Sequence, residues 1–345
     1  MVRGGDSSGS ALAVVVGILK ISKVPFWFLW TTPLLFGYFG SAADHGFHNP
    51  VWFVLLVVAT WVCDATASIH NELVDREEDA VNQPERAALL RSLPEKVLWR
   101  VVWAGYLTLA IGAIPFTIFV GIAPAAILLA AGVAAPLYNW GPRFKRVPPL
   151  PQIVFGWVAA CEVAGAWAFN APWSTVSPIV WVVALFIAAA SVSKDLPDVE
   201  GDEAVGAASI FSIKKLWQRA TTLVVVHTSP YALVFILAAV GAVPARVLWV
   251  LVLVPVVLAV VYFGERAQTT PAMIALYEVS YTYVHAFLLM LLVLMWPSVL
   301  AATASIATFG VRIVAVMMRL QPRIVGDEFT VWNGLKELAV QSSRV

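Results

Sequence analysis

Residues 51–79 read VWFVLLVVATWVCDATASIHNELVDREED. The first two thirds of this stretch are mostly apolar and span about 20 residues, the length of an α-helix that crosses the hydrocarbon core of a bilayer. The stretch then ends in NELVDREED, where five of nine residues are acidic. It therefore predicts a membrane-spanning helix whose end carries a dense group of carboxylates.

Further apolar runs of similar length occupy most of the chain. Of its 345 residues, 60% are hydrophobic and only 12% are charged, whereas about a quarter of the residues in soluble domains are charged. This composition excludes a soluble globular enzyme and a disordered chain. The net charge of +1 excludes a protein that binds nucleic acid through a basic surface.

The predicted fold class is all-α, a polytopic membrane helical bundle of nine transmembrane helices, and the run 299–317 is a candidate for a tenth C-terminal hydrophobic helix. The nine predicted spans are 24–43, 51–71, 98–119, 121–139, 151–170, 176–194, 219–242, 245–263 and 274–296.

Basic residues favour one orientation of these spans. With the N-terminus in the cytosol, every lysine and arginine except Arg246 falls on the cytosolic side, as the positive-inside rule requires. The start of the chain lacks the features of a signal peptide or a transit peptide, which predicts an integral protein of a bacterial plasma membrane. The expected domains are a cytosolic segment (1–19), a membrane domain (20–296), and an extra hydrophobic helix followed by a cytosolic tail with a short helix (297–345).

Polar residues of the first acidic stretch recur at helical spacing. Asn71, Asp75 and Asp79 are four residues apart, so a helix places them on one face. Asp64 and Ser68 extend this face back into the membrane, where ionisable side chains usually face the interior of the bundle. We expect Asp64 to line the same cavity and to contact substrate.

A second acidic stretch, KDLPDVEGD at residues 194–202, follows the sixth predicted span. Asp195, Asp198 and Asp202 share one side of a helix, and Pro197 suits the first turn of a new helix. A single acidic run is usually a solvated loop, but carboxylates are rare near a membrane, and here two runs with matched spacing end at the same face. Both are all-oxygen ligand sets, which Mg²⁺ prefers together with the phosphates of a substrate.

The chain resembles the UbiA superfamily of intramembrane prenyltransferases at three places. NELVDREED (71–79) resembles the first family motif, Asn-Asp-x-x-Asp-x-x-x-Asp, with Glu72 in place of the usual aspartate, and AVNQPER (80–86) resembles its continuation. KDLPDVEGD (194–202) resembles the second motif in the form of homogentisate-type enzymes, while the first motif also resembles that of chlorophyll synthases. LYNWGPRFKR (137–146) resembles the family's tyrosine and lysine segment.

This resemblance covers about residues 20–296 and implies a prenyl diphosphate donor, Mg²⁺, and an aromatic or other lipophilic acceptor. It implies that the prenyl tail lies between the helices and that the diphosphate lies at the cytosolic mouth. The metal ligands that it implies are Asn71, Asp75, Asp195 and Asp198. The catalytic residues that complete or orient this set are Asp79 and Asp202. The residues that it implies for substrate binding are Arg86, Arg143, Lys145 and Lys194 at the phosphates and Tyr138 beside the allylic cation.

Two other functions remain open. A terpene cyclase on the same scaffold would use the same metal sites, with a double bond of the donor as the nucleophile in place of an acceptor. A cation transporter with carboxylate gates would carry ionisable groups near the membrane midplane, whereas the acids here cluster at one face. Glu278 and His285, seven residues apart in the ninth span, could bind the acceptor, act as a base, or form a hydrogen bond between helices.

Overall fold

The computed structural model describes residues 7–140, 147, 149–198, 216–267, 269–318, 320 and 331–342. Within these ranges every regular element is helical, which confirms the predicted all-α class. The elements are α1 (Ser7–Ile21), α2 (Val24–His45), α3 (Pro50–Val74), α4 (Arg76–Asn82), α5 (Pro84–Ser92), α6 (Glu95–Phe119), α7 (Ile122–Asn139), α8 (Leu150–Trp167), η2 (Trp173–Thr175), α9 (Ile179–Lys194), η3 (Leu196–Asp198), α11 (Leu216–Ala239), η4 (Ala245–Leu253), α12 (Val254–Arg266), α13 (Thr270–Met295), α14 (Val299–Met317) and α15 (Val331–Ser342).

The predicted spans coincide with these long apolar helices. Nine helices of the described chain are long and apolar enough to cross a membrane, and they match eight of the nine predicted spans and the candidate tenth run 299–317, which is α14. The first predicted span, 24–43, corresponds to α2, which passes this test only together with Ala11–Ile21. A further crossing results if Ala11–Ile21 and α2, which meet at a bend of 48°, form a single span. The chain is therefore an integral membrane protein. The helix α1 is a finding of the structure, because no helix was predicted in segment 1–19.

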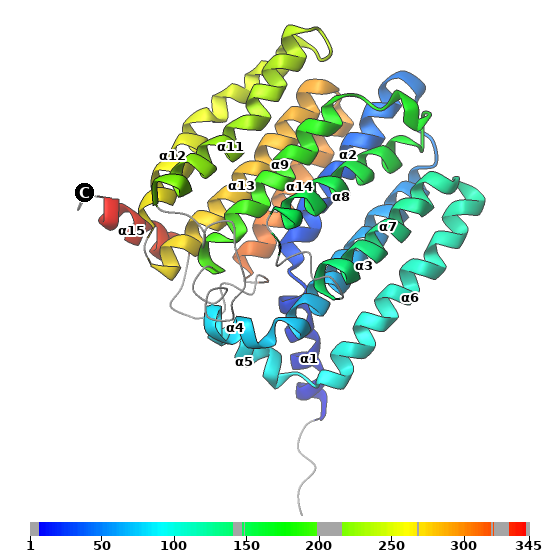
Figure 1. The fold of residues 1–345 in the computed structure, drawn as a ribbon. Helices are drawn as coiled ribbons and strands as arrows, with labels where there is room; N and C mark the ends of the chain where they lie inside the picture. Colours follow the sequence, from blue (N-terminus) through cyan, green and yellow to red (C-terminus); the bar gives the residue numbers. More distant parts are fainter. Residues whose placement is uncertain are drawn as a thin grey trace, which may run out of the picture.

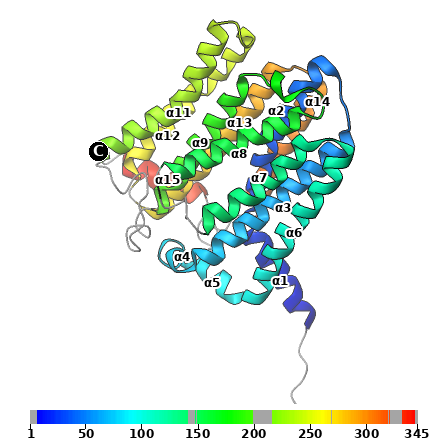
Figure 2. The same ribbon diagram turned by 45° about the vertical axis from the view of Figure 1, so that its right-hand side comes forward.

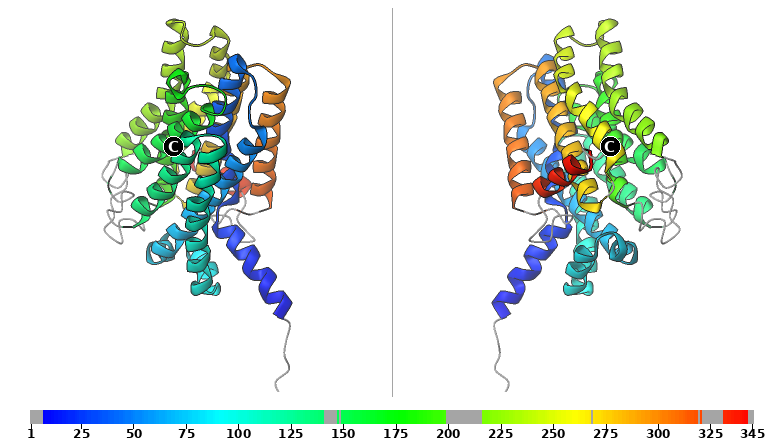
Figure 3. Two further views of the ribbon diagram at one scale, coloured as in Figure 1. Left: turned by 90° about the vertical axis from the view of Figure 1, so that its right-hand side faces the viewer. Right: turned by 90° about the vertical axis from the view of Figure 1, so that its left-hand side faces the viewer.

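The long helices lie side by side, and the two ends of the bundle differ (Figure 1). One end carries the short helices α4 and α5, and we call it the α4–α5 end. The opposite end carries short connections, such as the turn between α6 and α7. Turning the molecule shows that α1 projects beyond the α4–α5 end (Figure 2) and that α15 lies across α12 and α13 (Figure 3). The long connections after the second and sixth predicted spans thus begin at the same end, as the sequence predicted.

The helices in the middle of the bundle differ from those at its edge. Most residues of α9 and α13 are buried, whereas α6 and α14 are buried along only a small part of their length. On α6 the exposed side chains form a row of large apolar residues, namely Trp103, Leu107, Ile111, Ile114 and Ile118. Their spacing of three or four residues puts them on one face of the helix. In a membrane protein such a face contacts the lipid tails.

Arg246 is the one basic residue that the predicted topology left outside, and the structure gives it a local role. It lies at the start of η4, at the end of the bundle opposite to α4 and α5. Its Nε donates to the carbonyl of Leu294 at 2.6 Å and its Nη2 donates to the carbonyl of Met295 at 2.9 Å. The guanidinium therefore satisfies the last carbonyl groups of α13, which have no partner within the helix.

One arginine lies elsewhere than predicted. Arg312 was assigned to the cytosolic end of the chain, but it lies within α14 and is 2% exposed. It donates to Thr282 Oγ1 at 2.9 Å and pairs with Glu278 at 3.9 Å, and the ring of His285 packs against Phe309 of α14. Glu278 and His285 therefore both contact α14, and this supports the interpretation that they join helices.

The helices α2 and α8 approach each other closely at Gly37. A Cβ atom there would collide with the carbonyl of Val163 and would lie 2.8 Å from the backbone nitrogen of Trp167. Since backbone atoms cannot move aside, we expect Gly37→Ala to lower the free energy of unfolding by about 1–3 kcal/mol, measured by denaturation in detergent. Gly112→Ala on α6 is the matched control, because no atom lies within 4 Å of its added Cβ. Equal stability of the two variants would contradict the prediction.

Candidate active site

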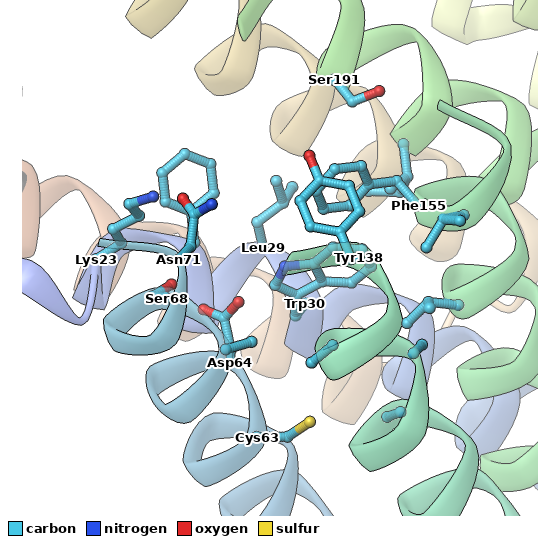
Figure 4. A pocket seen from close by; sticks show the side chains of 18 of the residues that line it. Lys23, Leu29, Trp30, Cys63, Asp64, Ser68, Asn71, Tyr138, Phe155 and Ser191 are labelled. Carbon is cyan, nitrogen blue, oxygen red and sulfur yellow. The ribbon is translucent and has the colours of Figure 1, made fainter. Parts of the chain in front are cut away.

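An apolar cavity lies between α2, α3, α7, α8, α9 and α13 (Figure 4). On α7 the small side chains of Ala131, Ala134 and Ala135 leave space for it. The polar and charged side chains that line it near the α4–α5 end are Lys23, Asn71, Arg86 and Lys194. The predicted site residues that line it are Asp64, Asn71, Arg86, Tyr138 and Lys194. Cationic side chains therefore lie at one end of the cavity and apolar side chains line the rest. Such a cavity suits a ligand with an anionic head and an apolar body.

The first acidic stretch forms one edge of the mouth. The predicted single helix is divided at Asp75, where α3 ends and α4 begins. Helical hydrogen bonds nevertheless continue through the break, from the Asp75 N–H to the Asn71 carbonyl and from the Asp79 N–H to the Asp75 carbonyl, at 2.9 and 2.8 Å. The side-chain amide of Asn71 donates to Asp75 Oδ2 at 2.6 Å and to Asn139 Oδ1 at 3.0 Å. Asn71 and Asp75 are therefore held together, and α7 supports them through Asn139.

The second acidic stretch lies beside the first. After α9, the chain forms the 3-10 turn η3, in which the Asp198 N–H donates to the Asp195 carbonyl at 3.3 Å. Gln152 of α8 donates to Asp195 Oδ2 at 3.1 Å, and Gln83 donates to Asp198 Oδ1 at 3.4 Å. Gln83 lies between α4 and α5, so its amide connects two segments that are 115 residues apart in the sequence. The two acidic stretches thus lie at one mouth.

Lys194 and Tyr138 meet at the same mouth. Tyr138, from the last turn of α7, lies within hydrogen-bonding reach of the Lys194 ammonium. The carboxylates of Asp195 and Asp198 attract this ammonium. The ring of Tyr138 packs edge-on against Phe155, with 5.5 Å between the ring centroids. An aromatic face and a cation therefore flank the apolar space just below the acidic residues.

Glu72 forms a buried ion cluster at the same end. It is fully buried, it forms an ion pair with Arg86, and it lies 3.1 Å from the Lys23 ammonium. Arg86 also donates to Gln83 Oε1 at 2.9 Å. A single carboxylate therefore holds two cations that line the cavity, and through Gln83 this cluster is connected to Asp198.

The predicted residues fall into three groups. Those that the structure brings to the mouth or the wall of the cavity are Asp64, Asn71, Asp75, Arg86, Tyr138, Lys194, Asp195 and Asp198. Asp79 forms the second group: it lies on α4, four residues after Asp75, and is half-buried. Those that lie outside the described residues are Arg143, Lys145 and Asp202.

The structure brings several residues to the mouth for which the sequence predicts no role in the site. Lys23 had been counted only among the cytosolic basic residues, and Gln83 stood unused within the quoted AVNQPER segment. Asn139 likewise stood unused within the quoted LYNWGPRFKR segment, and Gln152 carries no signal in the sequence, because it is a polar residue near the start of an apolar run. Only their contacts across the bundle mark them as supports of the acidic residues.

The donors at the mouth fit Mg²⁺ by their chemistry. Asn71, Asp75, Asp195 and Asp198 offer only oxygen ligands, and each carboxylate accepts a hydrogen bond from a neutral amide. Among the described residues, no three His, Cys, Asp or Glu side chains converge closely enough to form a metal site by themselves. Mg²⁺ commonly binds through a few carboxylates, several waters and the phosphates of a substrate.

Comparison with known proteins gives matches of two kinds. The model of the UbiA prenyltransferase family matches residues 29–272. Digeranylgeranylglyceryl phosphate synthase of Methanopyrus kandleri is 32% identical over 160 residues, which are 44% of this chain and 53% of the relative. The similarity therefore spans about half the length of that relative.

Solved structures match along nearly the whole chain at low identity. A UbiA homolog from Archaeoglobus fulgidus bound to DMAPP and Mg²⁺ is 14% identical, with 95% of each chain covered and a TM-score of 0.46. The structure reported for digeranylgeranylglyceryl phosphate synthase in membranes is 15% identical, with 93% of this chain and 98% of that chain covered and a TM-score of 0.46.

The family match extends over most of the sequence, from α2 to the start of α13. It includes both acidic stretches and the segment that contains Tyr138. The chain belongs to the UbiA prenyltransferase family.

Proposed function

We propose that the chain transfers a prenyl group from a prenyl diphosphate to an aromatic or other lipophilic acceptor, with Mg²⁺ as the cofactor. The observation that carries this proposal is the contact between the two acidic stretches through Gln83 and Asp198 at the mouth of an apolar cavity. The oxygen donors suit a metal–diphosphate head, and the cavity suits an apolar tail. Membership of the UbiA prenyltransferase family supports the same reaction.

In the proposed reaction, the bond between C1 of the prenyl group and the bridging oxygen of the diphosphate breaks. Its electron pair leaves with the diphosphate. An electron pair of the acceptor forms the new bond to C1, and the acceptor loses a proton. The products are therefore the prenylated acceptor, diphosphate and a proton.

We assign the residues at the mouth to two tasks. The proposed ligands of Mg²⁺ are Asn71, Asp75, Asp195 and Asp198, with Asp79 and Asp202 in support. Bound Mg²⁺ would neutralise the charge of the diphosphate and make it a better leaving group. The proposed phosphate contacts are Arg86, Lys194 and, in the segment after α7, Arg143 and Lys145. Lys23 lines the same mouth and adds a further cation there.

Tyr138 is the proposed aromatic neighbour of the allylic group. Its side chain lines the apolar cavity within reach of Lys194, and the face of an aromatic ring there can stabilise a developing cation. The proposed catalytic unit is the membrane domain 20–296. The proposed location is a bacterial plasma membrane, and the distribution of basic residues favours an orientation in which the α4–α5 end faces the cytosol.

In the test, the purified chain is reconstituted in membranes. Mg²⁺ and one of a series of C10 to C20 prenyl diphosphates are then added, with and without a lipophilic acceptor. Released diphosphate and the mass of the lipid products are measured. Release that requires an acceptor, with a product mass equal to acceptor plus prenyl group, is the expected result. If diphosphate is released without an acceptor and the product is a cyclic hydrocarbon or alcohol, the chain is a terpene cyclase and the proposal is wrong. No release with any donor would overturn both and favour a cation transporter.

A further inference from the structure

The helix α14 is attached to the bundle by a buried polar contact. Arg312 of α14 is 2% exposed, and its Nη1 donates to Thr282 Oγ1 at 2.9 Å. The same guanidinium lies 3.9 Å from the carboxylate of Glu278, which is 3% exposed. A buried ion pair is costly and gives little or no stability beyond that of apolar side chains of similar volume. The contact therefore calls for an explanation other than the stability of the fold.

The two residues that Arg312 contacts fix the rotation of α13 about its axis. Glu278 and Thr282 are four residues apart, so they share the face of α13 that lies toward α14. A hydrogen bond is directional and weakens steeply when its angle changes, whereas apolar contacts are not directional. Figure 3 shows α14, in orange, at the side of the bundle beside α2, and α14 packs against both α2 and α13. The guanidinium therefore holds one rotational setting of α13 against this neighbour.

The adjacent face of α13 carries two tyrosines of the cavity wall. Tyr277 and Tyr281 each directly precede a residue that Arg312 contacts, and both line the cavity. Their ring centroids are 4.7 Å apart, and Tyr281 packs edge-on against Phe26 with 4.9 Å between the centroids. Phe26 also lines the cavity and follows Lys23 of the mouth by three residues. We call these three rings the aromatic wall, and it lies next to the mouth.

We propose that Arg312 is a positioning residue: by holding the rotation of α13, it keeps the aromatic wall in contact with the first isoprene units of a bound prenyl diphosphate. Adjacent residues of a helix are separated by about 100° of rotation, so a turn of α13 that separates Thr282 from Arg312 also moves both tyrosines. This inference rests on the proposed binding of a prenyl diphosphate in the cavity. Residues 277–317 lie beyond the part that the family model matches, so the role falls to a helix outside that part.

The first variant replaces the buried pair by apolar side chains, Glu278→Leu with Arg312→Met, so that neither charge stays buried alone. The probe is geranyl diphosphate with Mg²⁺, and its dissociation constant for the full chain in detergent is measured by calorimetric titration. The unfolding temperature without the probe should stay within about 3 °C of wild type, because apolar side chains often replace a buried ion pair at little cost. The probe should nevertheless bind about tenfold more weakly, because the aromatic wall is no longer held in place.

A double-mutant cycle tests whether this loss passes through the aromatic wall. Tyr277→Leu with Tyr281→Leu removes both rings of α13 and should weaken binding of the probe by about tenfold or more. In that background, the apolar replacement of Glu278 and Arg312 should add less than about twofold, because the groups that they position are gone. A further tenfold loss in that background would overturn the inference, because an independent structural role of Arg312 would be additive.

Thr282 provides a smaller change with a matched control. Thr282→Val removes the oxygen that accepts the hydrogen bond of Arg312 and should weaken binding of the probe by about threefold, whereas Thr282→Ser keeps a hydroxyl there and should rescue it. The control is Thr308→Val, whose hydroxyl donates to the carbonyl of Ala304 within α14 at 2.7 Å. Equal affinity of Thr282→Val and Thr308→Val would overturn the inference, and it does so even where the apolar pair fails to fold.

Diphosphate release separates this inference from the proposed function. If the probe binds, the cycle is non-additive and no acceptor is ever prenylated, the proposed reaction is wrong and the role of Arg312 stands. If an acceptor is prenylated and the apolar pair keeps the wild-type affinity for the probe, the reaction stands and the inference is wrong. No binding of the probe to the wild-type chain would overturn the inference, because the probe contains the isoprene units that the aromatic wall is proposed to contact.

Discussion

Replacing Asp75 by alanine is expected to lower the rate of diphosphate release by about 10³-fold or more. Asp75 accepts the hydrogen bond of Asn71 at 2.6 Å, so the substitution removes one proposed metal ligand and also the partner that orients a second. Stabilisation of charge by a bound metal contributes several kcal/mol to a transition state, and about 4 kcal/mol correspond to a factor of about 10³. The measurement is the initial rate of diphosphate release at saturating Mg²⁺ and donor.

Two controls make this result specific to the site. Asp44→Ala removes an exposed carboxylate from the opposite end of the bundle and should leave the rate within about twofold of wild type. Chelation of Mg²⁺ should abolish release from the wild-type chain, and added Mg²⁺ should restore it. An Asp75→Ala chain that unfolds at the wild-type temperature and keeps more than about a tenth of the rate would show that Asp75 is not a metal ligand.

Replacing Glu72 by alanine is expected to destabilise the fold by about 3–5 kcal/mol. Glu72 is fully buried and pairs with Arg86 and Lys23, and Arg86 itself is 3% exposed. The substitution therefore removes the carboxylate that compensates the charge of both cations, and the Arg86 side chain is almost fully buried. The free energy of unfolding in detergent measures this loss.

The matched control is the exposed ion pair of Arg76 and Glu95, whose side chains are 41% and 58% exposed. Glu95→Ala should cost less than about 1 kcal/mol, because water solvates both charges once they separate. A double variant, Glu72→Leu with Arg86→Met, should recover part of the stability lost in Glu72→Ala, because apolar side chains often replace a buried ion pair at little cost. If Glu72→Ala and Glu95→Ala are equally stable, the cluster does not stabilise the fold.

The same double variant separates stability from catalysis. Arg86 lines the mouth of the cavity, so its replacement by methionine should weaken binding of the donor diphosphate even where the fold is restored.

The ion cluster also explains why glutamate stands at position 72, where the family motif has an aspartate. The longer side chain of glutamate reaches Arg86 and Lys23 together, and neither is a neighbour of Glu72 in the sequence.

The spans could be predicted because each depends on local composition alone. A run of about 20 apolar residues must cross the bilayer or be buried, whatever its neighbours are. For this reason the predicted range 51–71 agrees with α3 and the predicted range 299–317 coincides with α14. The prediction was wrong for Arg312, because local composition does not reveal that Glu278 and Thr282 on another helix compensate a buried guanidinium.

The all-helical membrane fold, the two acidic stretches and the end of the bundle at which they lie could be predicted from the sequence. These features follow from hydrophobic length, helical spacing and the distribution of basic residues. Three contacts could not be predicted: Gln83 joins the two stretches, Glu72 pairs with Arg86, and Asp64 and Glu162 meet at one cavity. These contacts join residues on different helices, and they depend on how the helices pack and rotate against one another, which no single run of sequence specifies.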